Sequence, residues 1–172
     1  VTLCANCRFK PVKWLAEAYI FVMRGTPLML QLFFFYYGLP FLPGIGQYLR
    51  LSSFAAAALS FTLNYAAYFA EIFRGGLLSI DRGQYEVSHV LGLTSFQTMT
   101  RIIIPQMIRV TLPSIGNEAI TLVKDTALVA SIALPELLHY AKGIVTRDFT
   151  TTPFIVAAFI YLLITFVVTV LF

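Results

Sequence analysis

The chain has 172 residues, of which 59% are hydrophobic and 12% are charged, and its formal net charge at pH 7 is +4. A soluble domain carries about twice that charged fraction, so the composition excludes an ordinary soluble protein and indicates an integral membrane protein. The basic residues are scattered along the chain, which argues against a nucleic-acid-binding surface.

The N-terminal segment contains a small basic cluster and a lone CxxC motif. The cluster consists of Arg8, Lys10 and Lys13, and we expect it to lie in the cytoplasm. A zinc site would need a second ligand pair near Cys4 and Cys7, but both histidines of the chain lie in other segments. No metal site is therefore expected.

Long apolar segments predict an all-α membrane protein with four spans. The spans cover about residues 18–39, 53–78, 107–134 and 153–172. In the first, Thr26 and Pro27 predict either a helix start or a kink. Seven basic residues lie on one side, if Arg74 and Arg109 near the span ends are counted, and three lie on the other, which places both ends of the chain in the cytoplasm. Residues 135–152 are then an outer connection.

A polar stretch at about residues 79–105 separates the second and third spans. Asp81, with a glutamine three residues later, predicts a helix start, and Gly92 predicts a left-handed helix end. Thr94 and Gln97 have the spacing of a capping box and open another helix. The sequence therefore predicts two short helices joined by a glycine elbow outside the hydrocarbon.

Polar residues inside the second and third spans are functional candidates, because ionisable groups are costly in a membrane. At helical spacing they form two stripes bearing both signs of charge, which would suit a zwitterion. Its ammonium would lie near carboxylates, and its carboxylate near Lys124 or amide donors. The candidates for a substrate path are Asn64, Tyr68, Glu118, Thr121, Lys124 and Asp125.

Structural interpretations of the same residues stay open. Lys124 and Asp125 could neutralise each other or cap broken helices. For Glu71 we favour an ion pair with Arg74, one helical turn away. The aromatic run at residues 33–37 is interpreted as lipid-facing packing.

The polar stretch also carries a resemblance. It has the spacing of the "EAA" loop in the membrane subunits of bacterial ABC importers, at Glu86, Val87, Ser88, Gly92, Ile102, Ile104 and Pro105. Val and Ser replace two alanines of that pattern, and Ile replaces a leucine. In that family the loop is a coupling helix that sits in a groove of a cytoplasmic ATPase. The resemblance implies that the ATPase contacts are Gln84, Glu86, Val87, Ser88, Val90, Leu91 and Gly92.

Other stretches resemble the polar amino-acid branch of the same family, which imports histidine, arginine, glutamine, glutamate or cystine. They are residues 24–28 (RGTPL) with Gln31, residues 65–76, and residues 124–126 (KDT) with Leu128 and Ser131. This resemblance implies a type I ABC importer transmembrane domain over residues 1–172. Family members usually have five core spans, so the first span is expected to be missing and the chain trimmed at both ends.

The sequence and its resemblance together predict the permease subunit of an ATP-driven importer of polar amino acids, in a bacterial cytoplasmic membrane. The chain lacks a GxxxxGK[ST] motif, so we expect it to have no catalytic site or cofactor of its own, with ATP and Mg²⁺ bound by a separate ATPase subunit. Further expected partners are an extracytoplasmic binding protein and a second or sister permease. One alternative is another cargo, such as methionine or an osmolyte. The other is an ion-driven carrier, although the sequence shows neither inverted repeats nor gating charges.

Overall fold

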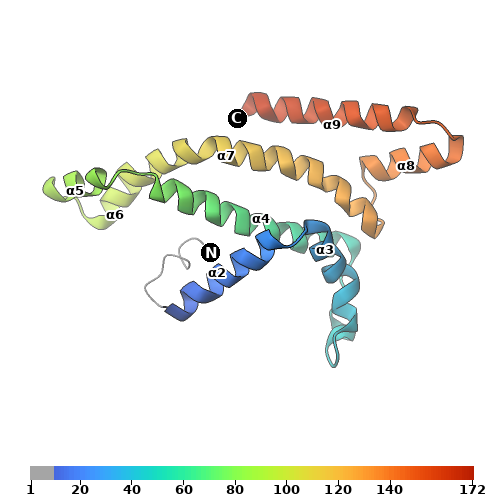
Figure 1. Ribbon diagram of the computed structural model, residues 1–172, viewed down its shortest axis with the longest axis horizontal. Helices are drawn as coiled ribbons and strands as arrows, with labels where there is room; N and C mark the ends of the chain where they lie inside the picture. Colours follow the sequence, from blue (N-terminus) through green and yellow to red (C-terminus); the bar gives the residue numbers. More distant parts are fainter. Residues whose placement is uncertain (1–9) are drawn as a thin grey trace.

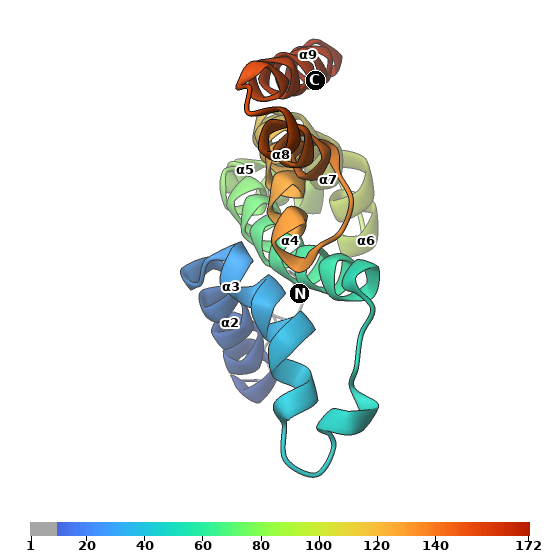
Figure 2. The same cartoon turned by 90° about the vertical axis from the view of Figure 1, so that its right-hand side faces the viewer.

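The computed structural model describes residues 10–172, except for the side chain of Gln47, and its regular elements in this range are all helical. The predicted cytoplasmic position of Arg8 and the CxxC motif lie outside the described residues. The long helices stack in the order α2, α4, α7 and α9, each contacting the next (Figures 1 and 2).

The first predicted span is sharply broken. Helix α2 (Lys10–Gly25) ends before Pro27, and α3 (Leu28–Phe33) then continues through a π-helical turn, Phe34–Gly38, and a 3₁₀ turn, Leu39–Phe41. The two arms meet at 104°. Pro27 lacks an N–H and is extended, with ψ of 135°, so it cannot continue the hydrogen-bond ladder of α2. A new helix thus starts beside Pro27 and the chain also bends there, so both of the expected features are present, although no side chain caps α3.

Helix α4 (Ser53–Leu78) confirms the helix predicted for the second span. It follows a 3₁₀ turn at Gly46–Tyr48, and Ser52 caps it by accepting a 3.2 Å hydrogen bond from the Ala55 N–H. Small buried residues of α4, including Ala67 and Ala70, pack on Ala16 and Ile20 of α2. Small side chains at such contacts let helices approach closely in a membrane.

Beyond α4 the chain forms the predicted elbow. Helix α5 (Arg82–Val90) is followed by α6 (Ser95–Thr98), a π-helical turn (Met99–Ile103) and α7 (Ile104–Asp125). Asp81 caps α5 by accepting a 2.6 Å hydrogen bond from the Gly83 N–H, and Gly92 has φ of +73°. The capping box of Thr94 and Gln97 is present. Pro105 does not end the helix: it lies in the first turn of α7, where a residue without an N–H is tolerated.

The close packing of α4 on α7 depends on Gly76. A Cβ atom at this position would lie 2.3 Å from the Thr111 Cγ2 atom and 3.0 Å from the Met107 Cγ atom, both on α7. Glycine therefore sets the separation of these two helices near the elbow.

The third predicted span ends in a tighter helix. After α7 the chain forms a 3₁₀ helix, Thr126–Ile132, which packs through Val129 and Ile132 on Leu32 and Ala57 of α3 and α4. The predicted outer connection contains helix α8 (Leu137–Asp148), which the sequence interpretation missed. Glu136 caps α8 by accepting bonds from the backbone N–H groups of Leu138 and His139.

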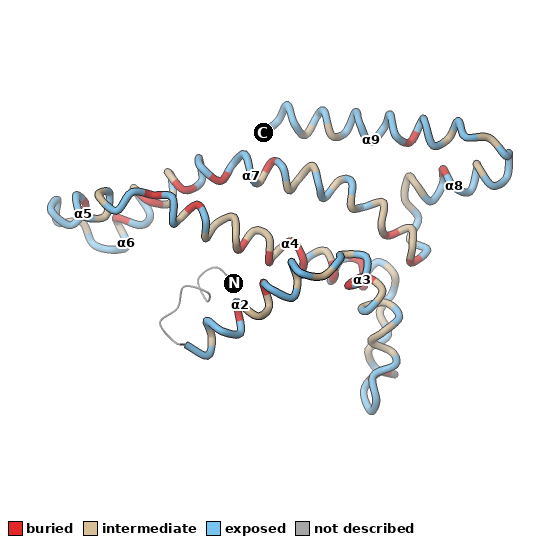
Figure 3. The backbone as a smooth tube through the Cα atoms, viewed as in Figure 1, coloured by how far each residue is buried: buried red, intermediate tan, exposed pale blue. Residues whose placement is uncertain are grey.

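The last predicted span is confirmed as helix α9 (Thr152–Leu171), which lies mostly exposed along one edge (Figure 3). By length and hydropathy, α9 could cross a membrane, and the bent pair of α2 and residues 28–41 adds a second crossing if it is one span. In the described chain, α4 and α7 do not meet this criterion, so the expected four spans are not confirmed by hydropathy. The charged residues of α7 are one reason.

Candidate functional site: a polar cavity between α2, α4 and α7

The site begins with the break between α2 and α3, where the backbone leaves the helix. The side-chain amide of Gln31 donates to the Met23 carbonyl at 2.9 Å and to the Thr26 hydroxyl at 2.8 Å. Asn64 of α4 donates from its amide to the Met23 carbonyl at 3.0 Å and to the Gln31 Oε1 atom at 3.1 Å. These bonds satisfy carbonyls that the helix end would leave unpaired and fix the break against α4.

A cavity of about 360 Å³ opens beside this break. Its volume is at the lower end of the range typical of small-molecule sites, roughly 300–1,000 Å³. The wall includes five of the six residues predicted for the substrate path, Asn64, Tyr68, Glu118, Thr121 and Asp125, together with Arg24 and Tyr65. The cavity thus combines the non-helical backbone of residues 26–27 with polar side chains from three helices.

Two carboxylates of α7 face this cavity, and their environments differ. The Tyr65 hydroxyl of α4 donates a 2.8 Å hydrogen bond to the Asp125 Oδ2 atom. Glu118 is half-buried and has neither a hydrogen bond nor an ion pair within the described residues. A half-buried carboxylate without a protein partner is free to accept from a ligand.

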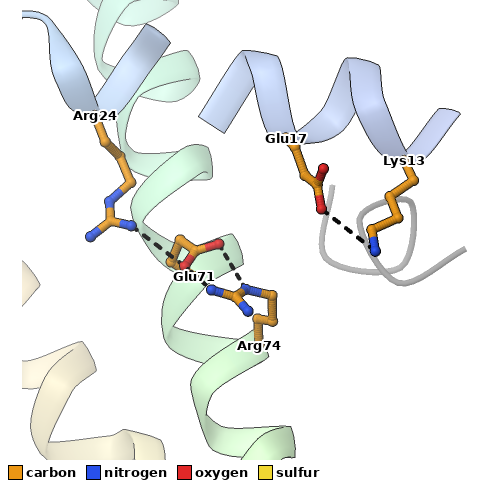
Figure 4. A network of polar contacts seen from close by, with 5 residues as sticks. All are labelled: Lys13, Glu17, Arg24, Glu71 and Arg74. Atoms are coloured by element: carbon orange, nitrogen blue, oxygen red, sulfur yellow. Dashed lines mark hydrogen bonds and ion pairs between the residues drawn. The ribbon is translucent and has the colours of Figure 1, made fainter. Parts of the chain in front are cut away.

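Arg24 supplies positive charge to the same wall. It lies in the last turn of α2, where a cation is favoured by the helix dipole. Its guanidinium lies 5.2 Å from the ring centroid of Tyr68 and forms a 3.5 Å ion pair with Glu71 (Figure 4). Arg24 and Tyr68 also line a second cavity of about 530 Å³, which includes Glu71 and Arg74. The two cavities therefore adjoin at Arg24.

Lys124 does not line the polar cavity with the other five predicted site residues. It lines a different cavity of about 420 Å³, which is bordered by α9 residues including Tyr161 and Thr165. Its neighbour Asp125 instead bonds to Tyr65, and the described residues show no ion pair between Lys124 and Asp125. Adjacent residues of a helix point about 100° apart, so the two side chains take different sides of α7.

The structural interpretation of Glu71 is confirmed. Arg74 donates to both of its carboxylate oxygens, from Nε at 2.9 Å and from Nη2 at 2.6 Å. Figure 4 shows this pair on α4, with Arg24 reaching it from α2 and the Lys13–Glu17 pair lying apart from it. This pair uses two of the roughly four acceptor positions of the Glu71 carboxylate, so a second cation such as Arg24 can still contact it.

The elbow at α5 and α6 forms a second candidate site, at the end of the stack (Figure 1). Its apolar side chains are exposed in the isolated chain: Val87, Val90, Leu91 and Phe96 are 59%, 88%, 69% and 77% exposed. Gln84 and Glu86 are also exposed, whereas Ser88 is fully buried and bonds to the Gln84 carbonyl at 2.5 Å. Exposed large apolar side chains that are concentrated in one short segment are typical of a docking surface.

The far end of the stack is bordered by α8. Arg147 donates two hydrogen bonds to Asp148, which lower the pKa of that carboxyl below its usual value. The Tyr161 hydroxyl of α9 donates to Glu136 at 3.0 Å and ties the start of α8 to the last helix. These contacts lie away from the polar cavity.

Sequence reasoning did not select Arg24, Gln31 and Tyr65 as site residues. Tyr65 lies three residues before Tyr68, so the same helical spacing could have found it. Arg24 and Gln31 are part of the stretch that resembles the amino-acid branch, but their position at the cavity depends on the 104° bend.

The arrangement defines a class of protein: a helical membrane component with a charged cavity at a helix break and an exposed apolar elbow. The chain belongs to the family of binding-protein-dependent transport system inner membrane components, whose model matches residues 2–172. The probable amino-acid ABC transporter permease protein YckA of Bacillus subtilis is 41% identical over 162 residues, which are 94% of this chain and 70% of the relative.

Two further comparisons agree. The arginine transport system permease protein ArtQ of Bacillus subtilis is 38% identical, with 98% of this chain and 76% of the relative covered. The crystal structure of an amino acid ABC transporter with histidines has a TM-score of 0.88 and 36% identity to this chain. It covers 99% of this chain and 78% of the solved one. The predicted family and the fold class of a type I ABC importer are thus confirmed.

Proposed function

We propose that this chain is the permease subunit of an ATP-driven importer of polar amino acids, and that the cavity between α2, α4 and α7 lies on the amino-acid path. The relatives support the cargo class, because YckA and ArtQ are both described as transporting amino acids. The proposal places the chain in a bacterial cytoplasmic membrane with several crossings, including α4 and α7 as walls of the path.

The observation that carries the proposal is the pairing of opposite charges across one small cavity. Arg24 faces it from α2, while Glu118 and Asp125 face it from α7. An amino acid at neutral pH carries a carboxylate and an ammonium, and each can form a charge-assisted hydrogen bond to a group of opposite sign. Broken helices that expose backbone groups at such a cavity are a common design of membrane substrate sites.

Coupling to ATP hydrolysis is assigned to the elbow. Val87, Val90 and Leu91 would insert into a groove of a cytoplasmic ATPase, with Gln84, Glu86 and Gly92 around them. Ser88 supports α5 from its buried side and does not itself reach a partner. ATP and Mg²⁺ belong to the ATPase subunit, and this chain contributes no catalytic group.

The described helices form an open stack, with much of α9 and the outer faces exposed. A closed path therefore needs a second copy or a sister permease, and an extracytoplasmic binding protein delivers the amino acid. One uptake assay separates this proposal from its two alternatives. These are an importer of methionine or an osmolyte, and an ion-driven carrier.

The test is uptake into proteoliposomes that contain the permease, its ATPase and the binding protein. We expect accumulation of one or more of L-arginine, L-histidine, L-glutamine and L-cystine that requires ATP inside the vesicles. Accumulation driven by an ion gradient without ATP would contradict the proposal. Uptake of methionine or glycine betaine in place of these amino acids would contradict the assigned cargo.

A further inference from the structure

Arg24 has two groups of neighbours because it lies where the two cavities adjoin. Towards the larger cavity it contacts Glu71, and towards the smaller one it shares a wall with Glu118 and Asp125. Among the described residues that line the smaller cavity, Arg24 is the cationic one. Any anionic group of a ligand in this cavity therefore has one strong partner available.

The contact of Arg24 with Glu71 is weaker than the contact of Arg74 with the same carboxylate. The Arg24 Nη1 atom lies 3.5 Å from the Glu71 Oε2 atom, longer than a normal charge-assisted hydrogen bond. Arg74 occupies both oxygens of the same carboxylate, at 2.6 and 2.9 Å. The Arg24 side chain is also 43% exposed, and ion pairs with this exposure add little to stability. Glu71 thus stays paired when Arg24 leaves, and Arg24 loses little by leaving.

We infer that Arg24 binds the carboxylate of the transported amino acid, and that Glu71 holds Arg24 when the cavity is empty. This inference rests on the proposed function. The ammonium of the same amino acid faces Glu118 and Asp125 across the cavity. Substrate entry then breaks the Arg24–Glu71 contact, so that Arg24 distinguishes an occupied site from an empty one.

The backbone around Arg24 supports such an exchange. Arg24 lies two residues before the break at residues 26–27, and the carbonyl of Met23 before it accepts hydrogen bonds from Gln31 and Asn64. The main chain is therefore fixed while the long side chain turns between its two partners. The Tyr68 ring, 5.2 Å away, offers a cation–π contact that guides the guanidinium.

The experiment is equilibrium binding to the detergent-purified permease–ATPase complex without the binding protein, which removes that protein's own selectivity. The probes are the amino acid found to be taken up among L-arginine, L-histidine, L-glutamine and L-cystine, and its carboxamide analogue. The native complex should bind the amino acid at least tenfold more tightly than the amide. Arg24→Gln should weaken amino-acid binding about ten- to a hundredfold and abolish this discrimination.

Glu71→Gln provides the second variant, because it removes the competitor for Arg24 and should strengthen amino-acid binding. Arg147→Gln is the matched control, since it breaks an arginine–carboxylate pair away from the cavity and should leave both constants unchanged. The inference is overturned if Arg24→Gln still binds the amino acid at least about tenfold more tightly than the carboxamide, or if Glu71→Gln binds the amino acid more weakly. In either case, ATP-dependent uptake by the native complex still supports the proposed function. If the native complex shows no amino-acid binding and no ATP-dependent uptake, both the inference and the proposed function are overturned.

Discussion

Tyr65 of α4 donates a 2.8 Å hydrogen bond to Asp125 of α7, although 60 residues separate them in the chain. The bond joins two walls of the polar cavity at the point where α7 passes into a 3₁₀ helix. It therefore fixes the direction of one of the two carboxylates that we assign to the amino acid's ammonium.

Tyr65→Phe should weaken the apparent affinity for uptake by about tenfold, because hydrogen bonds to charged groups are worth about 1.5–3 kcal/mol and Asp125 loses its orientation. The phenyl ring keeps the packing, so the amount of folded complex should not change. Tyr161→Phe is the matched control, since Tyr161 makes a similar bond to Glu136 outside the cavity. Equal affinities in the native protein and Tyr65→Phe would show that Asp125 needs no support.

We expect Asn64 to have a structural role, unlike the other residues predicted for the path. It is buried and uses its amide to hold Met23 and Gln31 at the helix break. Asn64→Ala leaves the Gln31 oxygen unpaired, so we expect about 1–3 kcal/mol lower stability and less detergent-stable complex. Thermal unfolding and size-exclusion yield measure this loss, with Asn117→Ala on the exposed side of α7 as control. A loss of affinity at normal yield would instead assign Asn64 to the ligand.

Lys124→Gln should leave the apparent affinity for the amino acid unchanged, because this lysine lines the cavity beside α9 and not the one beside the helix break. Concentration-dependent uptake measures the effect. A tenfold or larger loss of affinity would mean that Lys124 reaches the ligand in the assembled transporter.

Much of the fold could be predicted because its signals are local. The ends of α4, the cap at Asp81 and the box of Thr94 and Gln97 each depend on residues within one helical turn. The site depends on contacts between distant residues. Helical spacing placed Lys124 and Asp125 on one broad face, but the packing of α4 and α9 decides which side chain meets which cavity.

One feature was predicted incompletely and one helix was missed. The bend after α2 was left as one of two alternatives, because a proline marks a break without giving its 104° angle. Helix α8 lies within a segment rich in charged residues, and it is held by the cap at Glu136 and by Tyr161 of α9.

Gly92 tests the coupling role of the elbow. A Cβ atom here meets nothing within 4 Å, so Gly92→Val adds only backbone strain at φ of +73°, at least about 1–2 kcal/mol. We expect the protein to insert normally, while substrate-stimulated ATP hydrolysis and uptake fall together. Gly143→Val in α8 is the control, because its site is equally open and its φ is not positive. Normal stimulation in Gly92→Val would remove the elbow from the coupling mechanism.

The most direct measurement of the central claim is the concentration dependence of amino-acid uptake for the native complex and Glu118→Gln. Glu118 faces the cavity without a hydrogen bond or ion pair in the described chain, so neutralising it should cost ligand binding and not folding. We predict a ten- to hundredfold loss of apparent affinity, about 1.4–2.8 kcal/mol, with basal ATP hydrolysis and complex yield unchanged. Asp148→Asn, which alters an exposed carboxylate outside the cavity, should change none of these. If Glu118→Gln has the same apparent affinity for the amino acid as the native complex, this result contradicts the placement of the amino-acid path in this cavity.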